Sequence, residues 1–217
     1  MSAFSLTNKR SIQYFQANHH LQTGDILLFV EHPKNSIMKL FTWMITTATH
    51  SEYSHAAVVL KDPTFIHPSL KGLFLWESSW EGTPDPQDNK IKLGVQITPI
   101  YQFLQNFSGQ IYVRRLLKGK DLIKNDKLQK IHNVVYEKPY DMNIKDWVDA
   151  WNRTDSEPQK TDRFWCSALV AYILVSLKFL PDEIDWSIIR PSDLSSKSTY
   201  LTFCECCEYF SIQTHVL

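Results

Sequence analysis

This 217-residue chain contains a cysteine, a histidine and a glutamate that could perform covalent chemistry together: Cys166, His55 and Glu77. A cysteine thiolate is a strong nucleophile, a histidine can take the proton of the thiol, and a carboxylate can orient the imidazole. The thiolate would attack a carbonyl carbon, and backbone N–H groups would stabilise the resulting oxyanion. We therefore expect cleavage of an amide, an ester or a thioester through an acyl-thioester intermediate.

The residues around Cys166 predict a buried helix that carries the cysteine in its first turn. The run 168–180 is apolar on almost every face, and a helix that is apolar all round belongs inside a domain. Thr161 or Asp162 is expected to cap this helix and Pro181 to end it. Unpaired N–H groups in the first turn favour the thiolate of Cys166. The alternative is an ordinary buried cysteine, which is common in protein cores.

His55 and Glu77 are polar residues within two apolar segments that are typical of strands. His55 precedes a run of small or apolar residues, so a charged imidazole there would require a partner. Glu77 follows the apolar and aromatic run 74–76. If the two strands are neighbours, Glu77 can hold one imidazole nitrogen while the other nitrogen faces Cys166. The alternatives are a core histidine with a satisfied hydrogen bond and a solvent-facing strand position for Glu77.

The rest of the pattern predicts an α+β chain in which an antiparallel sheet packs against the cysteine helix. Strands are expected within 21–30, 54–60, 73–79, 94–98 and 110–116, and helices at 11–20, 36–47, 101–107 and 120–136. The polar segment 81–92 is expected to be an exposed loop, and both it and 141–160 could shape a substrate cleft. We expect one domain over 1–217, with 1–20 as an N-terminal extension and 195–217 as a C-terminal segment.

The composition limits the classes of partner and compartment. Lys plus Arg equals Asp plus Glu at 23 each, and no basic run is interleaved with aromatic residues, so no nucleic-acid partner is expected. The first 20 residues lack the apolar core and cleavage site of a signal peptide. We expect a reducing, intracellular location in the cytoplasm, or in a virion if the source is a virus.

Three of the four cysteines are crowded together at Cys204, Cys206 and Cys207. This arrangement is not a disulfide framework, which agrees with a reducing compartment. We expect the three residues to lie on a C-terminal strand as small apolar side chains. The alternatives are acylation or a metal site, which would need further ligands when only His215 is near. No metal and no cofactor are expected.

Several short motifs occur in a fixed order along the chain, at 21–27, 54–58, 76–78, 94–100, 138–141 and 165–170. In this order they resemble the permuted papain-like NlpC-type cysteine hydrolases, above all the YiiX/YaeF-like branch, which has poxvirus relatives. In that superfamily the histidine strand precedes the cysteine helix. The resemblance covers 21–194 and implies a permuted papain-like fold.

The resemblance also implies roles for individual residues. It makes Cys166 the nucleophile, His55 the general base and Glu77 the third polar residue of the site. Asp25 would order the Thr-Gly turn before it rather than take part in chemistry. Four aromatic residues could line the substrate site or simply pack in the core: Tyr53, Trp76, Trp165 and Tyr140.

The resemblance leaves two classes of function open. The first is a cysteine hydrolase or acyltransferase acting on a peptide or an acyl lipid, since the superfamily contains peptidases, amidases and enzymes of acyl lipids. The second is a catalytically silent binding or structural protein of the virion type on the same fold. Peripheral membrane contact and the oligomeric state are left open by the sequence.

Overall fold

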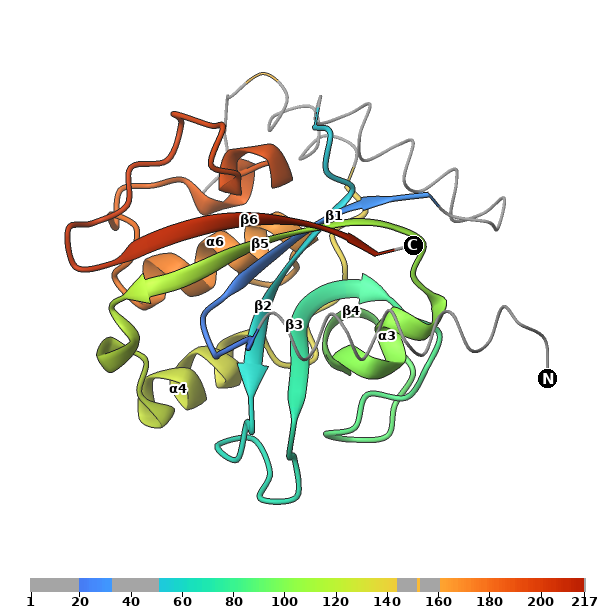
Figure 1. Ribbon diagram of the computed structural model, residues 1–217. Coiled ribbons are helices and arrows are strands. Elements are labelled where there is room, and N and C mark those ends of the chain that lie inside the picture. Colours follow the sequence, from blue (N-terminus) through green and yellow to red (C-terminus); the bar gives the residue numbers. More distant parts are fainter. Residues whose placement is uncertain (1–19, 33–50, 144–151, 153–160, 217) are drawn as a thin grey trace.

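The computed structural model describes residues 20–32, 51–143, 152 and 161–216, and its described strands form one antiparallel sheet (Figure 1). The order across the sheet is β4-β3-β2-β1-β5-β6. Its members are β1 (Ile26–Glu31), β2 (His55–Lys61), β3 (Leu73–Trp80), β4 (Leu93–Pro99), β5 (Gly109–Lys118) and β6 (Glu208–Val216). The predicted α+β class, antiparallel sheet and first five strands are confirmed. The helices expected at 11–20 and 36–47, and most of 141–160, lie outside the described residues.

Three α-helices lie in the described part of the chain: α3 (Ile100–Asn106), α4 (Asn125–Val135) and α6 (Cys166–Ser176). Single 3-10 turns occur at η1 (Lys120–Leu122), η2 (Trp186–Ile188) and η3 (Pro191–Leu194). The helix expected over 120–136 is wrong at its start, because Ile123 and Lys124 are extended between η1 and α4. Among the described residues, none of the helices has the length and apolar character needed to cross a bilayer.

Alternate residues of the strands enter two separate cores on the two faces of the sheet. In β2, Ala56, Val58 and Leu60 belong to the larger core, which also contains α6. Ala57 and Val59 belong to the smaller core, which contains apolar residues of α3. This division follows from the two-residue period of a strand. The sheet is therefore covered by α6 on one face and by α3 on the other.

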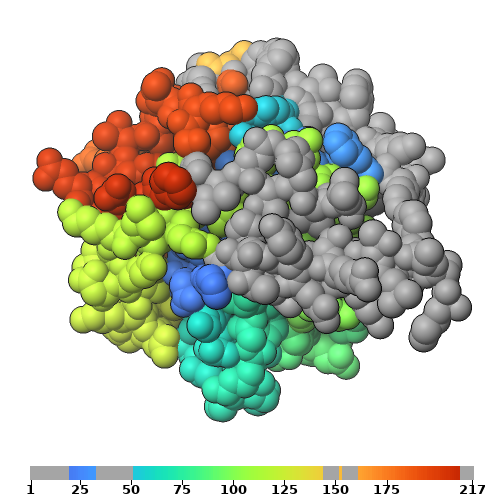
Figure 2. Space-filling model, viewed as in Figure 1, coloured from blue at the N-terminus to red at the C-terminus, as the bar shows by residue number. Residues whose placement is uncertain are grey.

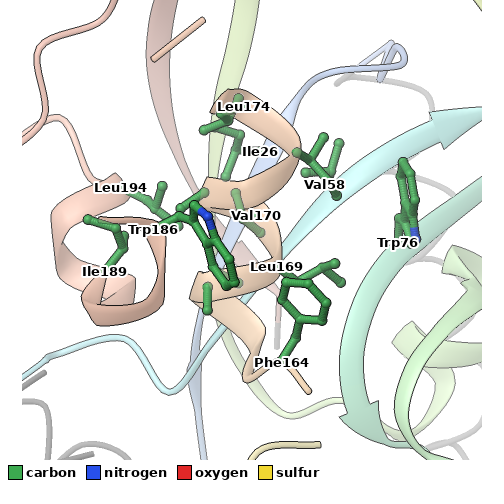
Figure 3. Close-up of a cluster of buried hydrophobic side chains, with 14 of the residues drawn as sticks. Ile26, Val58, Trp76, Phe164, Leu169, Val170, Leu174, Trp186, Ile189 and Leu194 are labelled. Atoms are coloured by element: carbon green, nitrogen blue, oxygen red, sulfur yellow. The ribbon is translucent and has the colours of Figure 1, made fainter. Parts of the chain in front are cut away.

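Helix α6 is buried along most of its length, as its apolar sequence predicts. Leu169, Val170 and Leu174 lie among side chains of the sheet and of η2 (Figure 3). Complete burial of a leucine or valine side chain stabilises a fold by about 1.5–3 kcal/mol. This packing, rather than a side-chain cap at the N-terminus, therefore accounts for the stability of α6.

The two ends of α6 differ from the sequence prediction. The N-cap residue is Trp165 instead of Thr161 or Asp162, because Phe164 pairs as an extended residue with Tyr140 and delays the start of the helix. The C-cap residue is Leu177, well before the proline that was expected to end the helix.

A Schellman motif ends α6. Lys178 adopts a left-handed conformation with φ of 67°, and its N–H donates to the Val175 carbonyl at 2.9 Å. The N–H of Phe179 donates to the Leu174 carbonyl at 2.8 Å. These two hydrogen bonds satisfy carbonyl groups that the helix end would otherwise leave free. Pro181 is therefore not the residue that stops the helix.

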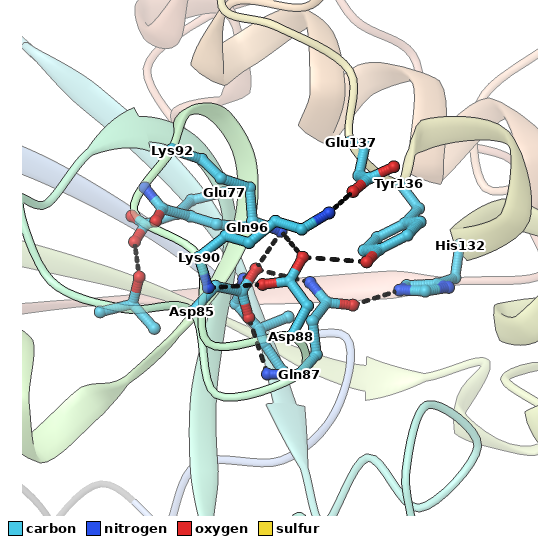
Figure 4. A network of polar contacts seen from close by, with 12 residues as sticks. Glu77, Asp85, Gln87, Asp88, Lys90, Lys92, Gln96, His132, Tyr136 and Glu137 are labelled. Carbon is cyan, nitrogen blue, oxygen red and sulfur yellow. Dashed lines mark hydrogen bonds and ion pairs between the residues drawn. The ribbon is translucent and has the colours of Figure 1, made fainter.

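The segment 81–92 is a loop with many exposed residues, as its polar sequence predicts, but Asp85 within it is buried. The buried carboxylate of Asp85 accepts hydrogen bonds from the backbone and side chain of Gln87, at 3.0 and 2.6 Å (Figure 4). Lys92 forms ion pairs with Asp85 at 2.7 Å and with Asp88 at 2.8 Å. Gln87 is also bonded to His132 of α4 at 2.7 Å. The loop is therefore fixed against α4 by buried polar contacts.

The cysteine cluster also differs from prediction. Cys204–Cys207 form a turn that precedes β6, and Cys204 and Cys206 are joined by a disulfide. The N–H of Cys207 donates to the Cys204 carbonyl at 3.2 Å, which closes the turn and delays the strand until Glu208. The expected strand position of these cysteines is therefore wrong, and two of them form one disulfide although no disulfide framework was expected.

Gly94 allows the chain to cross the end of β4 at very short range. It pairs with Pro139, and a Cβ atom at Gly94 would overlap the Lys138 carbonyl oxygen. Its φ of 148° is also unfavourable for other residues. The contact holds the segment 138–141 against the sheet, and Tyr140 of that segment pairs with Phe164, two residues before α6. Gly94 therefore helps to position the start of α6.

Substitution Gly94→Ala should destabilise the protein by about 2–4 kcal/mol, because backbone strain adds to the overlap with a backbone atom. Gly72→Ala is the matched control, since Gly72 also has a positive φ but a Cβ there would meet nothing within 4 Å. The control should lose about 1 kcal/mol. Urea denaturation of both variants measures the difference, and equal losses would contradict the role given to the crossing.

Candidate functional site

The structure joins His55 and Glu77 on neighbouring strands. Val58 of β2 pairs with Trp76 of β3, and continuing this register by one residue sets Ala57 opposite Glu77. His55 and Glu77 are then diagonal neighbours on one face, within reach of each other. The His55 Nε2 atom lies 2.7 Å from Glu77 Oε2, and the exposed fractions of the two side chains are 14% and 0%.

Thr98 holds the second oxygen of the buried carboxylate. Its hydroxyl donates to Glu77 Oε1 at 2.5 Å. The residue lies on β4 opposite Leu75, and is thus the diagonal neighbour of Glu77 on the other side. A carboxylate removed from water is tolerated only when its oxygens have partners. Sequence reasoning missed Thr98, although its alternation with apolar neighbours in 94–98 was the signal that could have found it.

The backbone beside Cys166 is anchored to the sheet. The hydroxyl of Ser78, next to Glu77 on β3, donates to the Phe164 carbonyl at 2.6 Å. The N–H of Phe164 donates to the Pro139 carbonyl at 3.1 Å. On the other side of the cysteine, the hydroxyl of Ser167 donates to the Ile189 carbonyl at 2.7 Å. Cys166 is a free, buried cysteine between these two fixed neighbours.

Cys166 and Glu77 both act on the imidazole of His55. Burial alone would lower the pKa of His55, but hydrogen bonding to Cys166 and Glu77 and their negative charges raise that pKa well above its usual value. Because Nε2 is occupied by Glu77, Nδ1 is the nitrogen left for the sulfur. Partners on both sides of the imidazole that favour its charged form account for this direction. The structure thus brings together the three predicted residues.

The start of α6 leaves backbone donors beside the sulfur. The first N–H groups of a helix have no partner within the helix. A serine or aspartate at the N-cap would take one of them, but Trp165 has no acceptor atom, and no side-chain cap bond is formed. The N–H of Cys166 and those of the next residues are therefore placed where an oxyanion could be bound.

The four aromatic residues predicted for the substrate site have different surroundings. Tyr140 is buried beside Cys166, and burial together with the charge of that cysteine raises its pKa well above the usual value. Trp165 is buried, and its indole Nε1 has no hydrogen-bond partner among the described residues. Tyr53 and Trp76 are fully buried core residues, which favours the packing alternative for these two.

Asp25 has the structural role that was expected of it. One carboxylate oxygen accepts the Gln22 N–H at 2.9 Å, and the other accepts the Leu116 N–H at 2.9 Å. The first bond orders the turn before β1, and the second ties that turn to β5. Asp25 therefore holds structure around the start of β1.

Glu81 is a second carboxylate near the site that sequence reasoning placed in an exposed loop. It follows β3 directly and is half-buried. Burial and the negative charge of Glu77 raise its pKa to about 8, while His55 acts in the opposite direction. Glu81 is therefore largely protonated at neutral pH. Its sequence neighbours gave no signal of this, because the effect comes from residues brought near by folding.

Comparisons with known proteins find little sequence similarity. No family model matches the chain, and no curated protein sequence matches it. A similar solved structure is the crystal structure of the metalloprotein yiiX from Escherichia coli O157:H7, at 22% identity and a TM-score of 0.35. The match covers 70% of this chain and 64% of that one, so this chain spans less than two thirds of yiiX. At this level, the similarity carries no argument about activity.

Replacing Thr98 with valine should cost about 1–3 kcal/mol of stability, because one oxygen of buried Glu77 loses its donor. The isosteric change leaves the packing volume nearly unchanged. Thr202→Val, at an exposed position, is the control and should change stability by less than about 0.5 kcal/mol. Urea unfolding at pH 7 provides both values. A Thr98→Val protein as stable as the control would show that the hydrogen bond is unimportant.

The raised pKa of Glu81 predicts a pH-dependent stability. A carboxyl whose pKa is higher in the folded state stabilises the fold when it is protonated. That contribution is complete below its unfolded pKa of about 4.3, and it is lost as the pH rises through about 8. Glu81→Gln mimics the protonated form. It should therefore match the wild type at pH 5 and exceed it by on the order of 1–2 kcal/mol at pH 9, after allowance for solvent screening.

Urea denaturation at pH 5 and pH 9 checks this expectation. Asp126→Asn, on the exposed side of α4, is a control for the loss of a negative charge, and it should show no such gain at pH 9. An equal gain in both variants would mean that the effect is a general charge effect rather than a property of Glu81.

Proposed function

We propose that this protein is a cysteine hydrolase or acyltransferase that cleaves an amide, an ester or a thioester. The proposal is supported above all by one observation: a buried histidine is bound through Nε2 to a fully buried carboxylate and interacts with a cysteine at a helix N-terminus. Cys166 is the nucleophile, His55 the acid and base, and Glu77 the residue that orients the imidazole. Thr98 positions Glu77.

The reaction begins with the Cys166 proton already on His55 Nδ1, in agreement with the raised pKa of His55. The thiolate attacks the carbonyl carbon of the substrate, which forms a C–S bond and moves an electron pair onto the carbonyl oxygen. Backbone N–H groups at the start of α6 stabilise this oxyanion, each contributing about 3 kcal/mol. The intermediate collapses, the bond to the leaving group breaks, and His55 donates its proton to that group.

The acyl-thioester is then resolved by a second attack. Water or another nucleophile gives its proton to His55 and bonds to the acyl carbon, and the C–S bond breaks to regenerate the thiolate. Throughout, Glu77 keeps Nε2 protonated, so that Nδ1 is the nitrogen that exchanges protons. The proposed substrate is a peptide or an acyl lipid.

We also propose that the fold is the permuted papain-like type and that the chain is related to the YiiX/YaeF-like branch. The order of the site residues supports this, because the histidine strand β2 precedes the cysteine helix α6. The antiparallel sheet packed against the buried α6 agrees with that architecture. We further propose that the chain is related to the poxvirus members of this branch.

An activity-based thiol probe tests the proposed site. We expect one equivalent of label on Cys166 near neutral pH, none in Cys166→Ala, and labelling about 10²–10⁴-fold slower in His55→Ala. Glu77→Gln should remain folded and react more slowly. Cys207→Ser, at a buried cysteine outside the site, is the control and should be labelled at the wild-type rate. Peptide mapping by mass spectrometry identifies the labelled residue.

Labelling of Cys204, Cys206 or Cys207 that is indifferent to His55 would contradict the proposal and favour a catalytically silent protein. Where Cys166 is labelled as expected, a panel of fluorogenic peptides and acyl lipids distinguishes the two substrate classes. Addition of amine or alcohol acceptors then separates hydrolysis from acyl transfer.

A further inference from the structure

A cluster of three cysteine sulfur atoms lies apart from the proposed active site. The Sγ atoms of Cys204, Cys206 and Cys207 all lie within 4.8 Å of one another. Cys204 and Cys206 are joined by a disulfide, while Cys207 is free and buried. The distance from Cys204 Sγ to Cys207 Sγ is 4.0 Å. Three sulfur atoms are therefore gathered at one point within four consecutive residues.

The turn that carries them is fixed to the C-terminal end of α6. The N–H of Cys204 donates to the Phe179 carbonyl at 2.9 Å, and the thiol of Cys207 contacts the same oxygen at 3.7 Å. Cys166 is at the other end of this 11-residue helix, roughly 16 Å away along its axis. The turn lies within the orange-to-red surface in Figure 2. The cluster is thus independent of the proposed catalytic site.

A buried positive charge lies beside the cluster. The guanidinium of Arg114 is stacked near the rings of Phe203 and Tyr209, at 5.1 and 5.5 Å, and only 8% of the residue is exposed. Its Nη1 donates to the Leu194 carbonyl at 2.6 Å, but its Nε has no hydrogen-bond partner within the described part of the chain. Among the described residues, no carboxylate forms an ion pair with it. A buried cation of this kind requires negative charge nearby.

The cysteines can supply that negative charge. Arg114 lies against the ring of Phe203, the residue that precedes Cys204. Lys118 is held at the turn, since its ammonium group donates to the Glu205 carbonyl at 2.6 Å. Two cations therefore lie close enough to the cluster to stabilise thiolates.

We propose that the reduced cluster of Cys204, Cys206 and Cys207 is a binding site for one Cu(I) ion held by three thiolates. Soft thiolate ligands favour Cu(I), Zn(II) and iron–sulfur clusters over hard metal ions. With metal–sulfur bonds of about 2.3 Å, the sulfur atoms of a trigonal site lie roughly 4.0 Å apart. The present distance from Cys204 to Cys207 already has this value.

The charges of such a site balance. Two molecules of a small thiol first reduce the disulfide to two cysteine thiols and leave as their own disulfide. Cu(I) then displaces one proton from each of three thiols as three Cu–S bonds form, without a change in the oxidation state of copper. The product carries two negative charges, which Arg114 and Lys118 offset.

The ligand count favours Cu(I) over Zn(II). Structural zinc is almost always four-coordinate, and the grouping in the described residues contains three ligands. His215 was the other candidate, but it lies eight residues further along β6, where it pairs with Gln110. At about 3.3 Å per residue, this is roughly 26 Å from the cluster. Three-coordinate Cu(I) needs no further ligand.

Anaerobic titration of the full chain with Cu(I), in competition with the chromophoric chelator bicinchoninate, tests the proposal. We expect the reduced protein to retain one equivalent of Cu(I) against the chelator and the oxidised protein to retain none. Cys207→Ser and Cys206→Ser should each lose this binding. Lys118→Gln should weaken it roughly tenfold. Cys166→Ser is the matched control and should bind as the wild type does.

Circular dichroism and urea unfolding establish that each variant is folded, and Cys206→Ser provides a less buried alternative if Cys207→Ser is unstable. Failure of the reduced wild type to withhold copper would overturn the proposal. So would equal binding by Cys206→Ser, or retention of Zn(II) in preference to Cu(I).

Discussion

A carboxylate with no exposure to water is the constraint on which the rest of the site depends. Glu77 has one oxygen bound to His55 of β2 and the other to Thr98 of β4. A slip of either pairing by one residue would turn its partner to the opposite face of the sheet. It would also leave a buried charge uncompensated, at a cost of several kcal/mol. The polar contacts therefore fix the register of three adjacent strands.

Strand β3 connects this polar pair with the helix that carries the cysteine. Consecutive residues of a strand point to opposite faces, and Glu77 and Ser78 use the two faces differently. The first binds the imidazole, and the second binds the Phe164 carbonyl just before α6. Because His55 begins β2, its ring lies at the end of the strand, where Cys166 can act on it. Two neighbouring side chains thus set the relative positions of His55 and Cys166.

Much of this arrangement could be predicted from local patterns. Apolar runs showed the first five strands, and the polar residues His55 and Glu77 were conspicuous because each interrupts or borders such a run. The even apolar character of 168–174 likewise showed that α6 is buried. These features depend on residues close together in the sequence, where the spacing of apolar residues indicates the secondary structure.

What could not be predicted depends on distant contacts. Thr98 is 21 residues from Glu77, and the pKa of Glu81 responds to charges that only the folded sheet brings near. The polar segment 81–92 seemed suited to water, but its acids and amides are satisfied by one another and by α4. The start of α6 was placed too early, because the extended pairing of Phe164 with Tyr140 overrides the capping preference of Thr161 and Asp162.

The identity of the N-cap residue has a consequence for the balance between stability and reactivity. A serine, threonine or aspartate in that position stabilises a helix by about 1 kcal/mol relative to a residue without a capping oxygen. With Trp165 there, the first turn of α6 forgoes this gain and relies on the packing of its later turns. The first turn of α6 thus lacks the stabilisation of a cap at the place where an unsatisfied donor is of most use to an incoming negative charge.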